Sequence, residues 1–175
     1  DGIEFFGGAV NVSDLLIWNN GDDALDVDQD YVGTINNVFL LGAGGSVMEL
    51  DGPEGPIASP LNHTIQNVTV SAIRANATAS ADLLNFDANT NITLNNVYYS
   101  AVDPLQRLNP NSVDALRGNF SNITINVPSA QVANYVNPGD SDLTNAVSSG
   151  SSSQANSLPF SAWSWAEVAG ELNGL

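Results

Sequence analysis

The sequence predicts an all-β fold: a right-handed parallel β-helix solenoid of about five coils with a C-terminal capping helix. Three observations predict it. A six-residue pattern returns along the chain, each copy carries Asn or Asp at its third position, and short runs of alternating apolar residues precede several copies. A β-sandwich also has short strands, but it does not require the same pattern to return at coil-like spacing.

The repeated pattern reads apolar, polar, Asn or Asp, apolar, any residue, apolar. Its copies start at positions 12, 35, 65, 94 and 120, so the steps between them are 23, 30, 29 and 26 residues. Steps of this length are typical of one solenoid coil. A leucine-rich repeat has a similar step but needs an L-x-x-L-x-L pattern and helix-forming runs, which the sequence lacks.

Each copy is predicted to form a strand, a sharp bend and a second strand. Asn and Asp tolerate the left-handed backbone conformation that such a bend needs. Stacked coils would align these side chains into a hydrogen-bonded ladder. After the bend, alternate residues should point into the core. The predicted ladder consists of Asp14, Asn37, Asn67, Asn96 and Asn122.

A second alternating pattern occupies residues 3–6, 25–28, 48–51 and 84–87. It should point its apolar residues inward and build two outward columns. Carboxylates stacked about 4.8 Å apart repel by about 3–4 kcal/mol per pair at an effective dielectric constant of about 20. The first column holds Glu4, Asp26, Glu49 and Asn85, and the second holds Asp28, Asp51 and Asp87.

Calcium would relieve this repulsion, because it binds several carboxylate and carbonyl oxygens. The predicted ligands are Asp26, Asp28, Glu49, Asp51 and Asp87. The alternative is that these carboxylates form a solvated face without an ion. The sequence has no EF-hand or related calcium-loop spacing that would decide between a calcium site and a solvated face.

The predicted organisation is a β-helix over residues 1–136 with inserted loops at 52–63 and 101–118, a flexible Ser/Gly/Asn loop at 137–159 and a helical cap at 160–175. Ser164 and Glu167 form a capping box. Trp165, Val168 and Leu172 should share one helix face that packs on the last coil or along its side. Trp163 and Trp165 should be buried there, with stacking on sugars as the alternative. The first coil has no predicted cap, so we expect an upstream domain or a neighbouring subunit to cover it.

Composition restricts the partners. The chain has 19 acidic residues, three arginines and no lysine, for a formal net charge of -16. This charge excludes nucleic acid as an expected partner, since phosphate binding needs basic residues. No segment is long and apolar enough to predict membrane insertion. Charged residues form only 13% of the chain, with many Asn, Ser and Thr, which favours a secreted, extracellular or cell-surface location.

The repeat resembles the pectin-lyase-like superfamily, and one local motif is similar to polygalacturonases. Asp1-Gly2 and Gly21-Asp22-Asp23 match two conserved pieces of that family about one coil apart. The resemblance implies Asp1, Asp22 and Asp23 as acid–base carboxylates of an inverting hydrolase. The sequence departs from the family at its Gly-His-Gly and Arg-Ile-Lys motifs. The corresponding residues, 44–47 and 48–52, match neither motif. Calcium-dependent polysaccharide lyases share the fold, but they need an Arg or Lys as base.

Our leading hypothesis from the sequence is a non-catalytic extracellular β-helix that binds a polysaccharide or another cell-surface component, or takes part in assembly, with calcium as a possible stabilising ion. The absence of a lysine and the single histidine, His63, favour it. One alternative is part of a carbohydrate-active hydrolase or lyase, with Asp1, Asp22 and Asp23 as site residues. Another is a structural subunit that stacks through its first coil.

Overall fold

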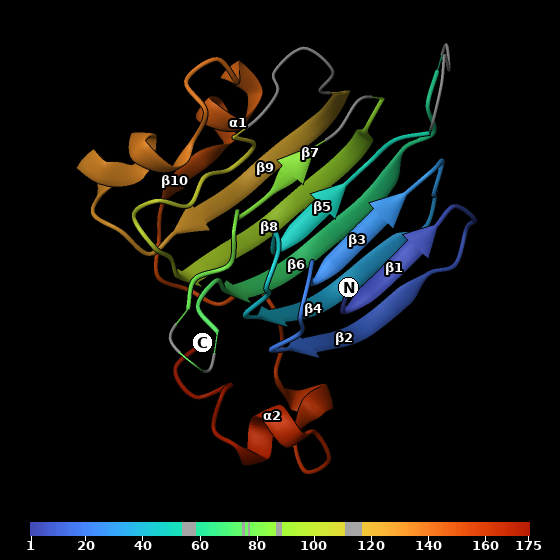
Figure 1. The fold of residues 1–175 in the computed structure, drawn as a ribbon. Coiled ribbons are helices and arrows are strands. Elements are labelled where there is room, and N and C mark those ends of the chain that lie inside the picture. The colour runs from blue at the N-terminus through green and yellow to red at the C-terminus, as the bar shows by residue number, and fades with distance from the viewer. Residues whose placement is uncertain (54–58, 75, 77, 87–88, 111–116) are drawn as a thin grey trace.

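The computed structural model describes residues 1–53, 59–74, 76, 78–86, 89–110 and 117–175. The chain forms a parallel β-solenoid of about five turns, as predicted, with two parallel sheets facing each other across the core (Figure 1). One sheet has the strand order β1-β3-β5-β7, and the other has the order β10-β9-β8-β6-β4-β2. The strands are β1 (Ile3–Phe6), β2 (Val12–Trp18), β3 (Leu25–Asp28), β4 (Thr34–Leu41), β5 (Met48–Leu50), β6 (His63–Ser71), β7 (Asn85–Phe86), β8 (Asn91–Ala101), β9 (Arg117–Ile125) and β10 (Val147–Ser149).

The Asn ladder holds the coils of the larger sheet in register. Its five residues have φ between 53° and 60°, which is the left-handed conformation predicted for the bend. Nδ2 of Asn37 donates to Oδ1 of Asp14 at 2.6 Å, and Nδ2 of Asn96 donates to Oδ1 of Asn67 at 3.0 Å. The five copies of the repeated pattern pair with one another position by position. The predicted stacking of the repeat is therefore confirmed.

The core lies between the two sheets and is filled by the alternating apolar residues of both patterns. Leu25 of β3 pairs with Met48 of β5, and both are fully buried. This stack of inward side chains continues past β7, because Leu84 forms a parallel β-bridge with Leu108, and Leu108 forms one with Val136. Sequence analysis missed these last two positions, which lie in irregular segments without an alternating pattern.

The β9 end of the solenoid is covered by a 3-10 helix, η1 (Ser129–Tyr135), and by α1 (Ser141–Ala146) (Figure 1). Leu143 of α1 is fully buried in the core. Asp140 caps α1 by accepting from the backbone N–H of Leu143 at 3.0 Å, and its other oxygen accepts from Nδ2 of Asn109 at 3.0 Å. Part of the segment predicted as a flexible loop at 137–159 is therefore helix and strand.

The C-terminal arm, residues 153–175, lies along the side of the first coils. It contains a 3-10 turn, η2 (Leu158–Phe160), and α2 (Trp165–Val168). Phe160 is fully buried and its ring meets that of Phe39 edge-on, with centroids 5.5 Å apart. Oγ of Ser164 accepts from the backbone N–H of Glu167 at 3.2 Å, so the predicted N-cap is present. The predicted placement of this helix, on the last coil or along its side, is wrong, because the arm packs against β2 and β4 at the other end of the sheet.

The predicted buried face of this helix is wrong for two of its three residues. Trp165 and Val168 are 79% and 68% exposed, whereas Leu172 is buried. The helix has only four residues, so its face does not extend to Leu172. The outward apolar side chains of β2 and β4 are covered instead by Phe160, Ala166 and Leu172. None of the described helices is long and apolar enough to cross a lipid bilayer.

Candidate active site

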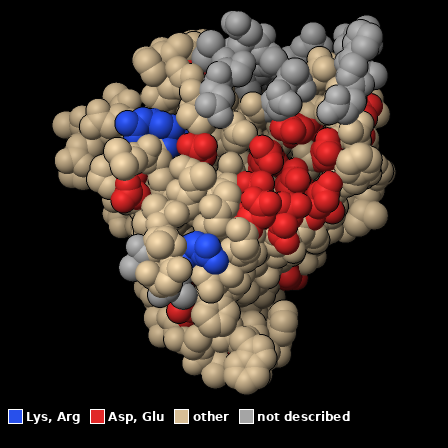
Figure 2. Space-filling view, viewed as in Figure 1, with Lys and Arg blue, Asp and Glu red and all other residues tan. Residues whose placement is uncertain are grey.

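Carboxylates gather on the outer face of the smaller sheet and at the turns that lead into it, and we call this surface the acidic face (Figure 2). Glu4 pairs with Asp26, Asp26 with Glu49, and Glu49 with Asn85, so the first predicted column is confirmed. The arginine side chains visible from this side lie outside the patch (Figure 2). The acidic face therefore presents a concentrated negative charge to solvent.

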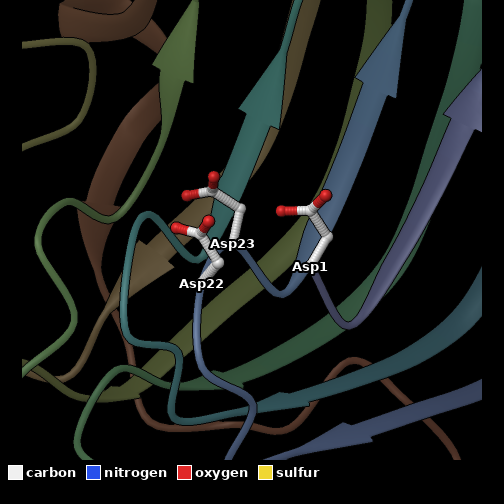
Figure 3. A group of neighbouring side chains, drawn as sticks. All are labelled: Asp1, Asp22 and Asp23. Carbon is white, nitrogen blue, oxygen red and sulfur yellow. The ribbon is translucent and has the colours of Figure 1, made fainter.

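Three aspartates at one end of the acidic face form a close group. Asp1 precedes β1, while Asp22 and Asp23 precede β3, which is the next strand of the same sheet. One carboxylate oxygen from each of the three lies within 4.8 Å of the others. Figure 3 shows Asp22 and Asp23 side by side, with the carboxylate of Asp1 pointing toward them. The residues singled out by the polygalacturonase resemblance thus come together.

The turn carrying Asp22 and Asp23 is fixed by hydrogen bonds from three coils. Nδ2 of Asn20 donates to the carbonyl oxygens of Asp22 and Asp23, both at 2.7 Å. The N–H of Gly2, in the coil before, donates to the carbonyl of Asp23 at 2.7 Å. The N–H of Gly45, in the coil after, donates to the carbonyl of Asp22 at 3.1 Å. These bonds to the carbonyl oxygens of both aspartates fix the turn from which their side chains extend toward Asp1.

Gly45 allows the next coil to approach these carboxylates closely. A Cβ atom at this position would lie 2.5 Å from Oδ1 of Asp23 and 2.8 Å from Oδ1 of Asp22. The backbone N–H of Ser46 donates to Oδ1 of Asp23, whose side chain is buried, whereas Asp1 and Asp22 are exposed. Sequence analysis missed the roles of Asn20 and Gly45. An Asn two residues before an Asp-Asp pair was the one available signal.

A second group links Asp1 to the acidic column. One carboxylate oxygen each from Asp1, Glu4 and Asp26 lies within 4.8 Å of the others. Burial, together with the nearby charges of Glu49 and Glu4, raises the pKa of Asp26 to about 6. The pKa of Glu49 is also raised, by burial and by Asp23, against a lowering effect from the hydrogen bond with Asn85. The acidic face therefore retains protons at a mildly acidic pH where isolated carboxyls are ionised.

Each group of three carboxylates also fits a metal ion. Calcium binds oxygens at about 2.3–2.6 Å, so two of its ligands lie up to about 5 Å apart. Of the five predicted calcium ligands, Asp26 alone belongs to one of these groups among the described residues, and Glu49 is its neighbour on β5. Asp28 instead accepts from the backbone N–H of Gln29 at 2.7 Å. Asp51 follows β5, and Asp87 lies outside the described residues.

Comparison with known families agrees with the coil architecture. A model of the family described as the pectate-lyase-like β-helix domain matches residues 1–167. The chain belongs to this family. A search of curated proteins and a search of solved structures found no match. A shared fold does not determine function, so the function of this β-helix domain has to be argued from its own residues.

The described arginine side chains and the histidine of this β-helix domain have partners of their own. Nε of Arg74 donates to Oδ1 of Asn19 at 3.3 Å, and Arg107 lowers the pKa of Asp82 against the stronger raising effect of burial. His63 begins β6 and is buried, and its ring centroid lies 5.7 Å from that of Tyr31. Burial lowers the pKa of His63 to about 4, so it is neutral at pH 7.

Proposed function

We propose that this β-helix domain hydrolyses a neutral polysaccharide outside the cell, and that the acidic face is its active site. The observation that carries the proposal is the approach of Asp1, Asp22 and Asp23 to within 4.8 Å on an open surface. Glycoside hydrolysis needs at least two carboxyl groups, one protonated and one ionised, beside the same glycosidic bond. The sequence favoured a non-catalytic role, and the convergence of these three side chains is what favours catalysis.

The chemistry divides between an acid and a base. A protonated carboxyl gives its proton to the glycosidic oxygen while the bond from that oxygen to the anomeric carbon breaks. A carboxylate accepts a proton from a water molecule, whose oxygen forms the new bond to that carbon. Asp26, whose pKa is raised to about 6, is a protonated carboxyl beside Asp1 in mildly acidic solution and is the candidate source of this proton. Asp1, Asp22 and Asp23 are the groups that we assign to contact the bond.

The charge of the site favours a neutral substrate. A uronic acid polymer would bring its own carboxylates against those of the acidic face, at a cost that grows with each repeat. Of the arginines whose side chains the structure describes, Arg74 donates to Oδ1 of Asn19, and Arg107 donates to backbone carbonyl oxygens. Hydroxyl groups of a neutral sugar, in contrast, donate hydrogen bonds to carboxylates. This argument also disfavours a lyase, which needs a basic residue beside the uronate.

The test is the release of reducing ends from a panel of neutral polysaccharides, with polygalacturonate for comparison, in buffer that contains a calcium chelator. We expect hydrolysis of at least one neutral polymer, and loss of at least 100-fold in rate for Asp22→Asn and Asp23→Asn. Asp142→Asn, an exposed carboxylate on α1, is the matched control. A folded wild-type protein that releases no reducing ends from any polymer would falsify the proposal.

The second candidate function is binding without hydrolysis, with calcium between the carboxylates. It is favoured by the same two groups of three oxygens, each of which fits one ion. Calcium titration followed by calorimetry separates the two functions. Tight binding that raises the melting temperature, together with no hydrolysis in chelator or in calcium, supports the binding role. Hydrolysis that persists in chelator and is inhibited by calcium supports the catalytic role.

A further inference from the structure

The C-terminal arm exposes two tryptophans that sequence analysis expected in the core. Trp163 and Trp165 are 67% and 79% exposed, and Val168, one helical turn beyond Trp165, is 68% exposed. The arm itself is anchored, because Phe160, Ala166 and Leu172 are buried against β2 and β4. The exposed rings therefore belong to a docked segment, not to a loose end. We call Trp163, Trp165 and Val168 the aromatic platform.

The ring of Trp163 is held in place before any ligand arrives. Its Nε1 donates to the carbonyl oxygen of Pro159 at 2.6 Å, and its centroid lies 6.3 Å from that of Phe160. Phe160 is in turn fixed by its edge-on contact with Phe39. With its one polar atom already bonded, Trp163 offers solvent a flat apolar surface. A fixed ring binds a partner at a lower entropic cost than a mobile one.

The backbone beside Trp163 is held in a rare conformation. Ala162 has a φ of 68°, in the left-handed region that non-glycine residues seldom occupy. Positions of this kind persist only where the surrounding structure enforces them, and they are often functional. This conformation lies between Phe160, which is buried, and Trp163, which faces solvent.

We propose that the aromatic platform is a carbohydrate-binding surface that holds a neutral polysaccharide chain. The apolar C–H faces of pyranose rings pack on the electron-rich faces of tryptophan, while hydroxyls at the rim bond to polar groups. The exposed carboxylates of Glu167 and Glu171 are such acceptors, and they disfavour an anionic polymer. The arm that carries the platform packs against Trp18, which is four residues before Asp22 in the chain.

This inference rests on the proposed function only for the choice of polymer. The platform would keep the enzyme on an insoluble substrate, and it would not touch the bond that is cleaved. Its loss should therefore weaken binding to the polymer and slow degradation of insoluble material. Cleavage of a short soluble oligosaccharide of the same sugar should be unaffected, because such a ligand reaches the acidic face without the platform.

The experiment measures depletion of protein from solution by insoluble neutral polysaccharides, using the double variant Asp22→Asn/Asp23→Asn so that the polymer is not consumed. Adding Trp163→Ala and Trp165→Ala should weaken binding at least 10-fold without changing the melting temperature by more than a few degrees. Leu105→Ala, which removes an apolar side chain that is 85% exposed elsewhere, is the control and should bind normally. Trp163→Phe keeps a ring but loses the bond to Pro159. Its affinity for the polymer should lie between that of the protein with both tryptophans and that of the double tryptophan variant.

Three results would overturn the inference: no binding to any neutral polymer, binding that is unchanged in the double tryptophan variant, or a wild-type dimer in solution that the tryptophan substitutions dissociate. The last result would mean that the platform joins two copies of the chain. Failure of the proposed function looks different. In that case the polymer still binds through the tryptophans while the wild-type protein releases no reducing ends from it.

Discussion

Asn67 and Asn96 lie 29 residues apart in sequence and one above the other in the solenoid, where Nδ2 of Asn96 donates to Oδ1 of Asn67 at 3.0 Å. Both have the left-handed φ that the bend requires, 57° and 54°. The same side chain thus does two things: it tolerates the bend and it links adjacent coils. This dual role makes the ladder a direct test of the coil model.

Replacing Asn67 by alanine should destabilise the protein by about 2–3 kcal/mol, because alanine loses the ladder hydrogen bonds and also disfavours a positive φ. Asn67→Gly is the matched variant, since glycine adopts this φ without strain and loses only the side-chain bonds. Urea unfolding followed by circular dichroism should therefore rank wild type above Asn67→Gly, and Asn67→Gly above Asn67→Ala. Equal stability of all three proteins would contradict the role of the ladder.

Gly45→Ala should reduce hydrolysis at least 10-fold while the fold persists. The new Cβ would lie 2.5 Å from Oδ1 of Asp23, so this carboxylate has to move away from its partners. Gly21→Ala is the steric control, because a Cβ there meets nothing within 4 Å. Initial rates on the hydrolysed polymer, with melting temperatures beside them, provide the measurement. Wild-type activity in Gly45→Ala would show that the carboxylate positions are not critical.

Stability should fall as pH rises through the range in which Asp26 ionises. Its pKa is about 6 in the folded protein and 3.8 ordinarily, so the folded state binds this proton more tightly than the unfolded state. The stability linked to this proton is fully present below the ordinary value and is lost as pH rises through about 6. Asp26→Asn should therefore raise the free energy of unfolding at pH 7 by on the order of 1 kcal/mol, after allowance for solvent screening, with no gain at pH 3.

Urea midpoints of wild type and Asp26→Asn between pH 3 and pH 8 test this prediction, with Glu171→Gln as an exposed control. The difference in urea midpoint between Asp26→Asn and wild type should appear only toward the high end of this pH range. A difference that is constant with pH would mean that the substitution acts through packing and not through charge.

Phe160→Ala should release the C-terminal arm. The ring is fully buried against Phe39, and removal of a buried phenylalanine costs about 3–5 kcal/mol. The arm can detach from β2 and β4 while the coils stay folded. We therefore expect faster proteolysis after residue 153 under conditions in which the coils do not unfold. Leu158→Ala is the control, since that side chain is 74% exposed. If Phe160→Ala resists protease as wild type does, Phe160 does not hold the arm in place.

The sequence by itself determined the solenoid. In a solenoid each residue contacts its counterpart one coil away, so the spacing of a regular repeat specifies which strands pair and in which register. The features that could be predicted from spacing are the Asn ladder, the inward apolar stacks and the column of Glu4, Asp26 and Glu49. Leu108 and Val136 were not predicted, because they extend a core stack through segments that have no repeat.

Only the tertiary structure decided what lies between and beyond the repeats. The meeting of Asp1 with Asp22 and Asp23 depends on how the turn after β2 is held by Asn20 and by Gly45 of the next coil, and no repeat encodes that turn. The arm likewise folds onto β2 and β4 through contacts between distant residues, which leave Trp163 and Trp165 outside. Amphipathic spacing predicts that a helix face is apolar, but the shape and apolar surface of the partner decide which residues it buries.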